Sequence, residues 1–166
     1  MPVSVHSGEF AEELAELHDG SVSLFVTLPV FRSMLVSEQR AETLARFESG
    51  IGEHLAQLDG ILGDVLIRRD RGDGDLTRSL FLALTRLRSR AASVARDRDI
   101  LAVVQQAQVF LMGSCSFALR FARQARIDPS VQVLEQSLGR IGSIALQLSS
   151  FQHDGLSPAE WSDAVA

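Results

Sequence analysis

The stretch FAEELAELHDGSVSLFVTLPVFRSML, residues 10–35, decides the fold class. Its hydrophobic residues recur at alternating intervals of four and three, with Ser21 in the same series: Phe10, Leu14, Leu17, Leu24, Leu28, Phe31 and Leu35. These intervals return each residue to one face of an α-helix. The stretch therefore predicts one long amphipathic helix that starts after an N-cap at Ser7 and bends at Pro29, where the backbone lacks a donor.

Four further segments have the same helical spacing. The second helix is predicted to begin after Ser37 and to end near Arg69, and a turn at residues 71–75 separates it from an arginine-rich third helix. The fourth, over about residues 100–125, is hydrophobic around an unusually wide arc, which is typical of a central or partner-facing helix. The fifth opens at Asp128, which is followed by a first-turn proline.

Three of these helices have a series of residues expected to face inward. These residues are Leu44, Phe47, Ile51, His54, Leu58, Ile61 and Val65 on the second; Leu76, Leu80, Leu84, Leu87, Ala91 and Val94 on the third; and Leu134, Leu138, Ile141, Ala145 and Leu148 on the fifth. The wide hydrophobic arc of the fourth helix includes Val103, Val104, Phe110, Leu111, Phe117, Leu119 and Phe121. Asp97 or Asp99 is expected to cap the start of the fourth helix.

These segments predict an all-α protein, because no stretch of useful length alternates as a strand would. Short connections between long amphipathic helices favour an antiparallel four-helix-type bundle with one extra helix. We expect a single domain over residues 1–166, with the bundle at about 8–152. Ser157, Pro158, Ala159 and Glu160 have the capping-box pattern and predict a short C-terminal helix at about 157–165, which carries Trp161.

The composition narrows the class of protein. The chain has no Lys, Asn or Tyr, whose codons are all A/T-rich, which indicates a high-GC genome. The single Cys115 cannot form an internal disulfide, and no export signal or membrane-spanning run is evident, so we expect a cytoplasmic protein. A net charge of −5 makes nucleic acid an unlikely partner.

The order of the helices resembles the YciF-type ferritin-like stress proteins of bacteria. The stretches that carry this resemblance are Glu16 to Asp19 with Leu28 and Pro29, the segment EHLAQL at residues 53–58, and the fourth and fifth helices over about 100–151. The resemblance implies a ferritin-like bundle. In that class, inward carboxylates and Glu-x-x-His pairs on facing helices build a di-metal centre.

The resemblance also implies that this chain has lost the metal centre. At the positions of the family's acidic ligands, the alignment places Ser21, Gln108, Leu111, Arg140 and Ile141. Only His54 keeps its identity, and Ile51 stands three residues before it where a Glu-x-x-His pair needs an acid. The cationic Arg140 and the hydrophobic Leu111 and Ile141 cannot offset the positive charge of two metal ions. We therefore expect no cofactor and no metal.

His54 has two interpretations. As a core histidine it would form a polar cluster with Ser21 and Gln108, because a buried imidazole needs hydrogen-bond partners. As a metal ligand it would act with Glu48, Glu53 or Asp59. The first interpretation is the favoured one. The remaining histidines, His6, His18 and His153, are expected to be solvated, and Cys115 is expected to behave as a buried hydrophobic residue.

Nine arginines between residues 68 and 98 form the main positive feature: Arg68, Arg69, Arg71, Arg78, Arg86, Arg88, Arg90, Arg96 and Arg98. They could bind phosphate, nucleic acid or an acidic partner, or they could form a solvated face paired with the acidic first helix. The second interpretation is favoured, because aspartates interrupt the series and no aromatic residues accompany it.

The glycine pairs Gly60 with Gly63 and Gly139 with Gly142 are expected to let helices approach closely. The alternative is a helix break at Gly60 to Gly63.

We therefore predict a non-enzymatic helical bundle that acts as an oligomeric structural or protein-interaction module. Phe110, Phe117 and Phe121 cannot all face one core from a single helix arc, so they are the predicted partner surface of a homodimer or larger oligomer. The alternative is a residual metal-binding or oxidative-stress protein of the ferritin-like class that uses His54.

Overall fold

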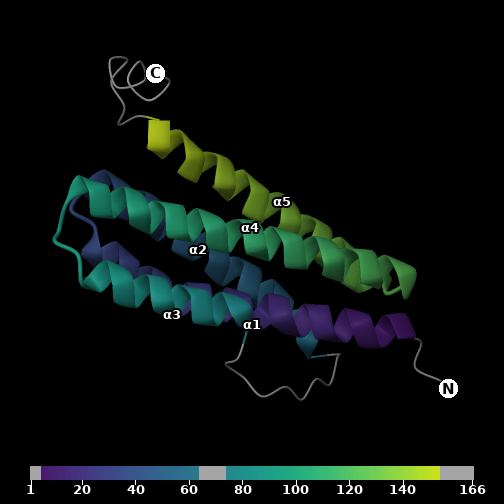
Figure 1. Ribbon diagram of the computed structural model, residues 1–166. Coiled ribbons are helices and arrows are strands. Elements are labelled where there is room, and N and C mark those ends of the chain that lie inside the picture. The colour runs from purple at the N-terminus through teal and green to yellow at the C-terminus, as the bar shows by residue number, and fades with distance from the viewer. Residues whose placement is uncertain (1–4, 64–73, 154–166) are drawn as a thin grey trace, which may run out of the picture.

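The structure, a computed structural model, describes residues 5–63 and 74–153. Across these residues the secondary structure is five helices without a strand, which are α1 Val5–Met34, α2 Glu38–Leu62, α3 Asp75–Arg88, α4 Val94–Gln124 and α5 Asp128–His153 (Figure 1). The predicted all-α bundle is therefore confirmed. The predicted C-terminal helix with Trp161 lies outside the described residues.

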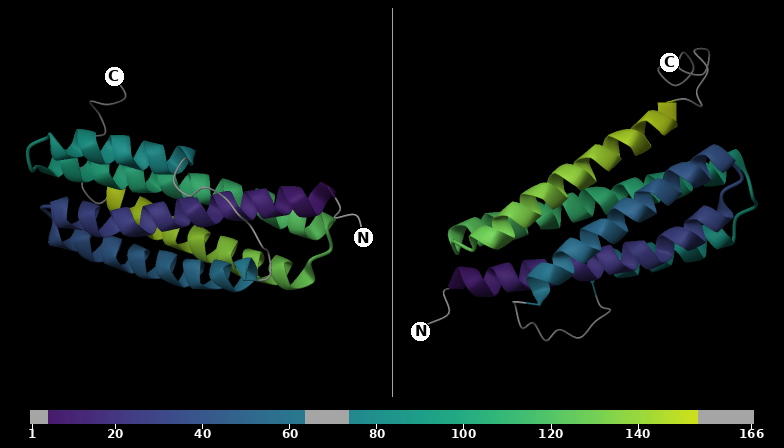
Figure 2. Two further views of the ribbon diagram at one scale, coloured as in Figure 1. Left: turned by 90° about the horizontal axis from the view of Figure 1, so that it is seen from below. Right: turned by 180° about the vertical axis from the view of Figure 1, so that it is seen from behind.

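Four of the helices form the bundle and one lies outside it. Helix α1 packs against α2 and α4, and α5 packs against both α2 and α4, so these four helices close a ring. Helix α3 is the extra helix and lies along α1 and α4 (Figures 1 and 2). Consecutive helices run in opposite directions, so α1 and α3 run in the same direction and both end beside the start of α4.

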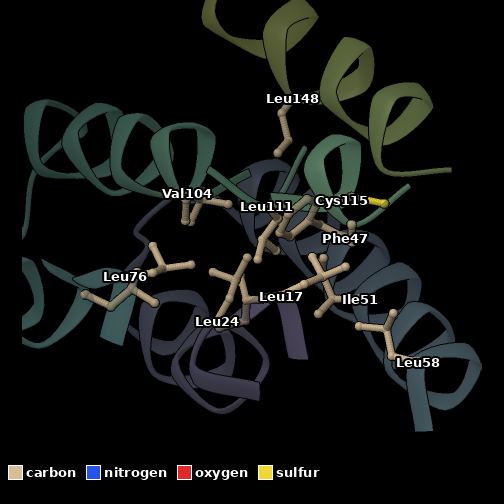
Figure 3. Close-up of a cluster of buried hydrophobic side chains, with 14 of the residues drawn as sticks. Leu17, Leu24, Phe47, Ile51, Leu58, Leu76, Val104, Leu111, Cys115 and Leu148 are labelled. Atoms are coloured by element: carbon tan, nitrogen blue, oxygen red, sulfur yellow. The ribbon is translucent and has the colours of Figure 1, made fainter. Parts of the chain in front are cut away.

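The core contains the residues that the helical spacing predicted. Six members of the α1 series have at most 1% of their surface exposed: Phe10, Leu14, Leu17, Leu24, Leu28 and Phe31. Figure 3 shows Leu17 and Leu24 meeting Phe47 and Ile51 of α2, with Leu111 of α4 above them. Burial of a hydrophobic face on every helix of the bundle is the main source of stability for such a fold.

Several predicted helix ends were wrong. Helix α1 begins at Val5, before the predicted cap at Ser7, and α2 ends at Leu62 with Gly63 as its C-cap, not near Arg69. Helix α4 begins earlier than predicted, because the hydroxyl of Ser93 accepts the N–H of Arg96 at 3.1 Å and caps it. Since α3 ends at Arg88, the neighbouring segment turns outward, and Ala91 and Val94, predicted to face inward, are exposed.

The prediction that the glycine pairs let helices approach closely was also wrong. A Cβ at Gly60 or Gly139 would meet nothing within 4 Å, and one at Gly142 would only touch Cε of Met112 at 3.8 Å. The closest approach among the described glycines is at Gly50 of α2, where an added Cβ would overlap the δ-methyl group of Ile144 on α5. The alternative, a helix break at Gly60 to Gly63, is the one observed.

Helix α4 is the central helix, in contact with α1, α3 and α5. An 18-residue window of α4 has a mean hydropathy of 1.4, so by length and composition α4 is a candidate membrane span. Half of that window is buried inside the bundle. A core helix meets the same criteria, and the contacts of α4 on three sides account for its wide hydrophobic arc.

Candidate functional site

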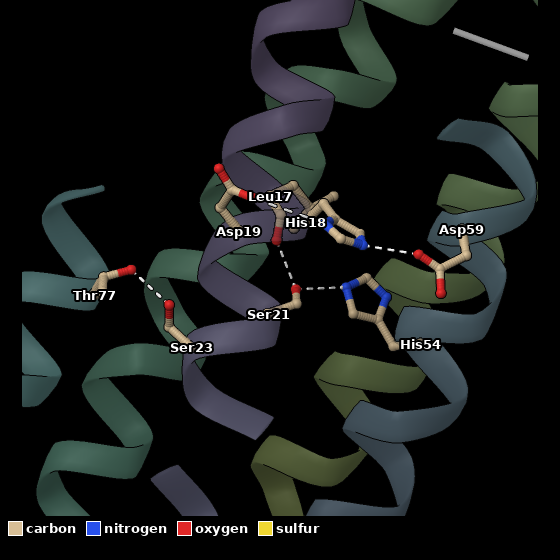
Figure 4. A network of polar contacts seen from close by, with 8 residues as sticks. All are labelled: Leu17, His18, Asp19, Ser21, Ser23, His54, Asp59 and Thr77. Atoms are coloured by element: carbon tan, nitrogen blue, oxygen red, sulfur yellow. Dashed lines mark hydrogen bonds and ion pairs between the residues drawn. The ribbon is translucent and has the colours of Figure 1, made fainter. Parts of the chain in front are cut away.

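A chain of polar side chains crosses the hydrophobic core around His54 of α2. The imidazole is completely buried. Its Nε2 lies 3.1 Å from Oγ of Ser21 on α1 (Figure 4). Its Nδ1 lies 3.0 Å from Oγ of Ser137 on α5. The Ser137 hydroxyl is in turn 3.1 Å from the side-chain amide of Gln57 on α2. This polar chain therefore joins three helices of the bundle.

The hydrogen bonds fix the direction in which protons are shared. Ser21 donates its hydroxyl to the carbonyl of Leu17 at 2.7 Å, so it accepts a proton from Nε2 of His54. In a neutral imidazole the other nitrogen, Nδ1, is then an acceptor, and Ser137 must donate to it. Because Ser137 has one proton, it cannot then also donate to Oε1 of Gln57, which lies 3.1 Å from its hydroxyl, so the two contacts are compatible only if the amide group of Gln57 is turned by 180°.

His54 is neutral at physiological pH. The pKa of His54 is lowered from 6.5 to about 4, mainly because a buried imidazolium would lose its hydration and to a smaller extent because Arg140 and His18 lie nearby. Neither serine can neutralise an imidazolium charge. The site is therefore a set of neutral hydrogen bonds that satisfies a buried imidazole.

The predicted cluster of Ser21, His54 and Gln108 forms only in part. Ser21 and His54 are brought together, but Nε2 of Gln108 donates to the backbone carbonyl of Ile141 at 2.6 Å. Ser137 takes the place that we expected Gln108 to hold. The signal for Ser137 was available, because it lies between Leu134 and Ile141 in the inward 3,4 spacing of α5.

The residues at this position do not fit a di-metal centre. Both nitrogens of His54 face serine hydroxyls, and Glu53 points to Arg140, whose Nη1 lies 2.7 Å from its carboxylate. Glu48 faces Arg32 at 3.5 Å. In the part of the chain that the structure describes, no three His, Cys, Asp or Glu side chains gather as metal ligands would. Serine hydroxyls and an ion-paired arginine cannot supply the anionic oxygens that two metal ions require.

His18 is more than a solvated histidine. It is mostly buried, and its Nε2 lies 2.8 Å from a carboxylate oxygen of Asp59 on α2, with Asp19 at 3.8 Å from Nδ1 (Figure 4). Asp59 is thus paired with His18 and not with His54. This hydrogen bond ties α1 to α2 beside the polar chain (Figure 4).

Cys115 of α4 lies in the core of the bundle, where its thiol donates to the backbone carbonyl of Leu134 at 3.6 Å. Burial raises the pKa of the thiol to about 12, because a thiolate would be poorly solvated there. Since the thiolate is the reactive form, this cysteine is suited to packing and not to nucleophilic chemistry.

A second buried polar site lies at the end of the bundle, at the start of α4. Asp97 is completely buried in the first turn of α4. Its carboxylate accepts the backbone N–H groups of Val36 at 3.0 Å and Ser37 at 3.1 Å, and Nη1 of Arg40 is 3.6 Å away. Asp97 therefore holds the connection between α1 and α2, whereas we expected it to cap α4.

Five of the nine arginines between residues 68 and 98 form two groups in the structure. Arg90 pairs with Asp99, and Arg96 donates to the carbonyls of Met34 and Arg90, so these two tie the start of α4 to neighbouring turns. Arg78, Arg86 and Arg88 of α3 are exposed. Arg68, Arg69 and Arg71 lie outside the described residues. The contacts of Arg90 and Arg96 therefore lie close to the start of α4.

The three phenylalanines predicted as a partner surface do not form one face. Phe117 is 51% exposed, but Phe110 and Phe121 are partly buried against the core. Val26 of α1 and Phe81 and Leu82 of α3 are more exposed than Phe117, and Val22 and Phe25 of α1 are exposed to 37% and 36%. The sequence did not single out these residues, because their exposure depends on where α3 docks.

Comparisons with known proteins identify the fold. No family model and no curated protein matches the chain. Among solved structures, YcfI from Rhodopseudomonas palustris, provisionally described as a structural protein, superposes with a TM-score of 0.79 at 12% identity and covers 90% of this chain and 96% of its own. The E. coli stress protein YciF gives a TM-score of 0.78 at 12% identity, with 90% and 95% covered. The resemblance inferred from the sequence is therefore confirmed at the level of the fold, and this chain is a helical bundle of the YciF type.

Proposed function

We propose that this chain is a non-enzymatic helical-bundle module that self-associates through the outer face of α1 and α3. The observation that carries the proposal is the exposure of four large hydrophobic side chains on that face, Val22, Phe25, Val26 and Phe81. Val26 and Phe81 are 62% and 68% exposed. A contiguous hydrophobic patch of this kind on a soluble protein marks an interaction site.

The four side chains share one face because of the way α3 lies on α1. Residues 25 and 26 lie one helical turn after residue 22, so both are its neighbours on the surface of α1. The hydroxyls of Ser23 and Thr77 are 2.6 Å apart, which fixes α3 beside α1 (Figure 4). Since the two helices run in the same direction, Phe81 lies one turn beyond Thr77, at the level of Val26. We call these four residues the α1–α3 face.

A second copy of the chain fits this face by charge. On one side of it lies α2, since a Cβ at Gly52 would be 3.2 Å from Phe25, and this side exposes the carboxylate of Asp59, which also contacts His18. On the other side α3 exposes Arg78 and Arg88. A twofold axis along α1 would set the acidic side of one protomer against the arginines of the other.

The chemistry of the buried groups supports a non-enzymatic role. His54 is neutral and enclosed by serines, and the Cys115 thiol has a pKa raised to about 12. Catalytic acids, bases and nucleophiles are tuned in the opposite sense, towards the working pH and with access to substrate. The alternative, a metal-binding or oxidative-stress protein that uses His54, finds no support in this set of side chains.

The oligomeric state tests the proposal. We expect light scattering to give the mass of a dimer at tens of micromolar protein, and we expect Val26→Asp or Phe81→Asp to give a folded monomer, because a buried unpaired carboxylate would oppose association. Val109→Asp is the matched control, since Val109 is 69% exposed on α4 and lies outside the α1–α3 face. It should leave the dimer intact. A monomeric wild type, or equal dissociation by all three variants, would refute the proposal.

A further inference from the structure

A second hydrophobic feature lies on the opposite side of α3, between α3 and α4. It is a groove of about 490 Å³, within the range of about 300–1,000 Å³ that is usual for small-molecule sites. Its lining is mostly hydrophobic and includes Ala83 of α3 with Val103, Ala107 and Phe110 of α4. Leu82, 62% exposed, stands at its edge.

The groove exists because the side chains that face each other across it are small. Helix α3 rests on the bundle through its large buried residues Leu76, Leu80 and Leu87. On the side towards α4 it presents Ser79 and Ala83, which face Ala107. These three side chains cannot fill the space between two helices whose separation the larger leucines set.

The two ends of the groove have opposite charge. Arg86 lines one end, and Asp75, the first residue of α3, lines the other. Eleven residues of helix separate them, so they lie about 16 Å apart along α3. A ligand with a hydrophobic body and a single anionic head would therefore bind in one direction, with its head beside Arg86 and away from Asp75.

We propose that this groove binds a medium-chain fatty acid, with the alkyl chain between Ala83 and Ala107 and the carboxylate at Arg86. The volume suits a small molecule, and the single cation at one end matches a single carboxylate. The site is independent of the proposed dimer, because Phe81 belongs to the α1–α3 face whereas its neighbour Leu82 borders the groove. Each proposal can therefore fail without the other.

Calorimetric titration with decanoate, as dispersed monomer at neutral pH, tests the proposal. We expect saturable binding to the wild-type protein and about fivefold weaker binding to Arg86→Gln, because the carboxylate loses its cationic partner. Arg78→Gln is the matched control, since Arg78 is an exposed arginine of α3 outside the groove, and it should bind as the wild type does. Decanol should bind the wild type and Arg86→Gln equally. No binding of decanoate, or equal binding by both arginine variants, would overturn the proposal.

A second pair of variants tests the position of the alkyl chain. Ser79→Phe would fill the groove from its exposed edge and should abolish binding of both decanoate and decanol. Thr85→Phe adds the same ring at an exposed α3 position outside the groove and should leave binding unchanged. Octanoate should bind the wild type several-fold more weakly than decanoate, because each methylene contributes its own burial. If Ser79→Phe keeps its helical circular dichroism and still binds decanoate, the ligand does not occupy this groove.

Discussion

His54 and Asp97 are both completely buried, but the bundle holds them by different means. His54 lies at the middle of the bundle as a neutral group between two serines. Asp97 lies at one end, where two backbone amides and Arg40 surround its carboxylate. The first site links helices α1, α2 and α5, and the second links α4 to the connection between α1 and α2.

The difference shows what a helical bundle accepts in its interior. A neutral polar group needs only hydrogen-bond partners, and short side chains such as Ser21 and Ser137 supply them from neighbouring helices. A carboxylate also needs donors that favour its charge, and backbone N–H groups are available only where a helix begins or a connection turns. The charged residue is therefore at the end of the bundle and the neutral one at its centre.

The largest effect is expected from removing the carboxylate. Asp97→Ala should lower the free energy of unfolding by about 4 kcal/mol, because it leaves the mostly buried Arg40 without its partner and two N–H groups without an acceptor. Urea titration followed by circular dichroism measures the loss.

The matched control for this variant is Asp99→Ala, two residues further along α4. Asp99 pairs with Arg90 and is 43% exposed, so its loss should cost less than about 1 kcal/mol. Equal losses for both variants would show that burial of Asp97 has no special role and would remove the contrast with His54.

A smaller effect is expected from the titration of His54. Because its pKa is about 4 in the folded protein against 6.5 when exposed, the unfolded chain binds a proton below pH 6.5 that the folded chain does not. Stability should therefore fall as the pH decreases from 6.5 and level off below about 4, with a total contribution of up to about 3 kcal/mol.

This contribution is measured as the difference between the wild type and His54→Gln in urea titrations across that pH range. At neutral pH the variant should be less stable by about 1–2 kcal/mol, because its amide replaces only part of the imidazole contacts. The gap should close and reverse as the pH falls. A gap that stays constant from pH 7 to pH 4 would mean that His54 does not titrate in this window. His18→Gln is a control for the other mostly buried histidine, which faces Asp59.

The smallest effect is expected for metal content. Protein purified without an affinity tag should contain no stoichiometric iron, manganese or zinc, because the neutral site at His54 offers one imidazole and two hydroxyls but no free carboxylate. Elemental analysis of the wild type and His54→Gln should give the same result. One or two metal ions per chain in the wild type, lost in His54→Gln, would instead make His54 a ligand and support the alternative function.

Much of this fold was predictable from the sequence. The 4,3 spacing on α1 and the series on α2 and α5 identified buried residues such as Leu24, Ile51 and Leu134, because a helix repeats its faces every 3.6 residues whatever lies around it. The same spacing placed His54 inside and marked Ser21 as a polar residue on an inward face. The lack of acids at the aligned positions was also a property of the sequence alone.

The partners of the buried groups were decided by the tertiary structure. His54 bonds to Ser137, 83 residues away, and Asp97 holds amides about 60 residues earlier, and no local pattern encodes which helices meet or at what level. Which hydrophobic side chains stay exposed also depends on where α3 packs against the other helices. Phe110 is partly buried and Phe81 is exposed because α3 lies against α1 and α4 through its leucines. Local periodicity determines which side of a helix is hydrophobic, whereas the packing of several helices determines which of those sides is covered.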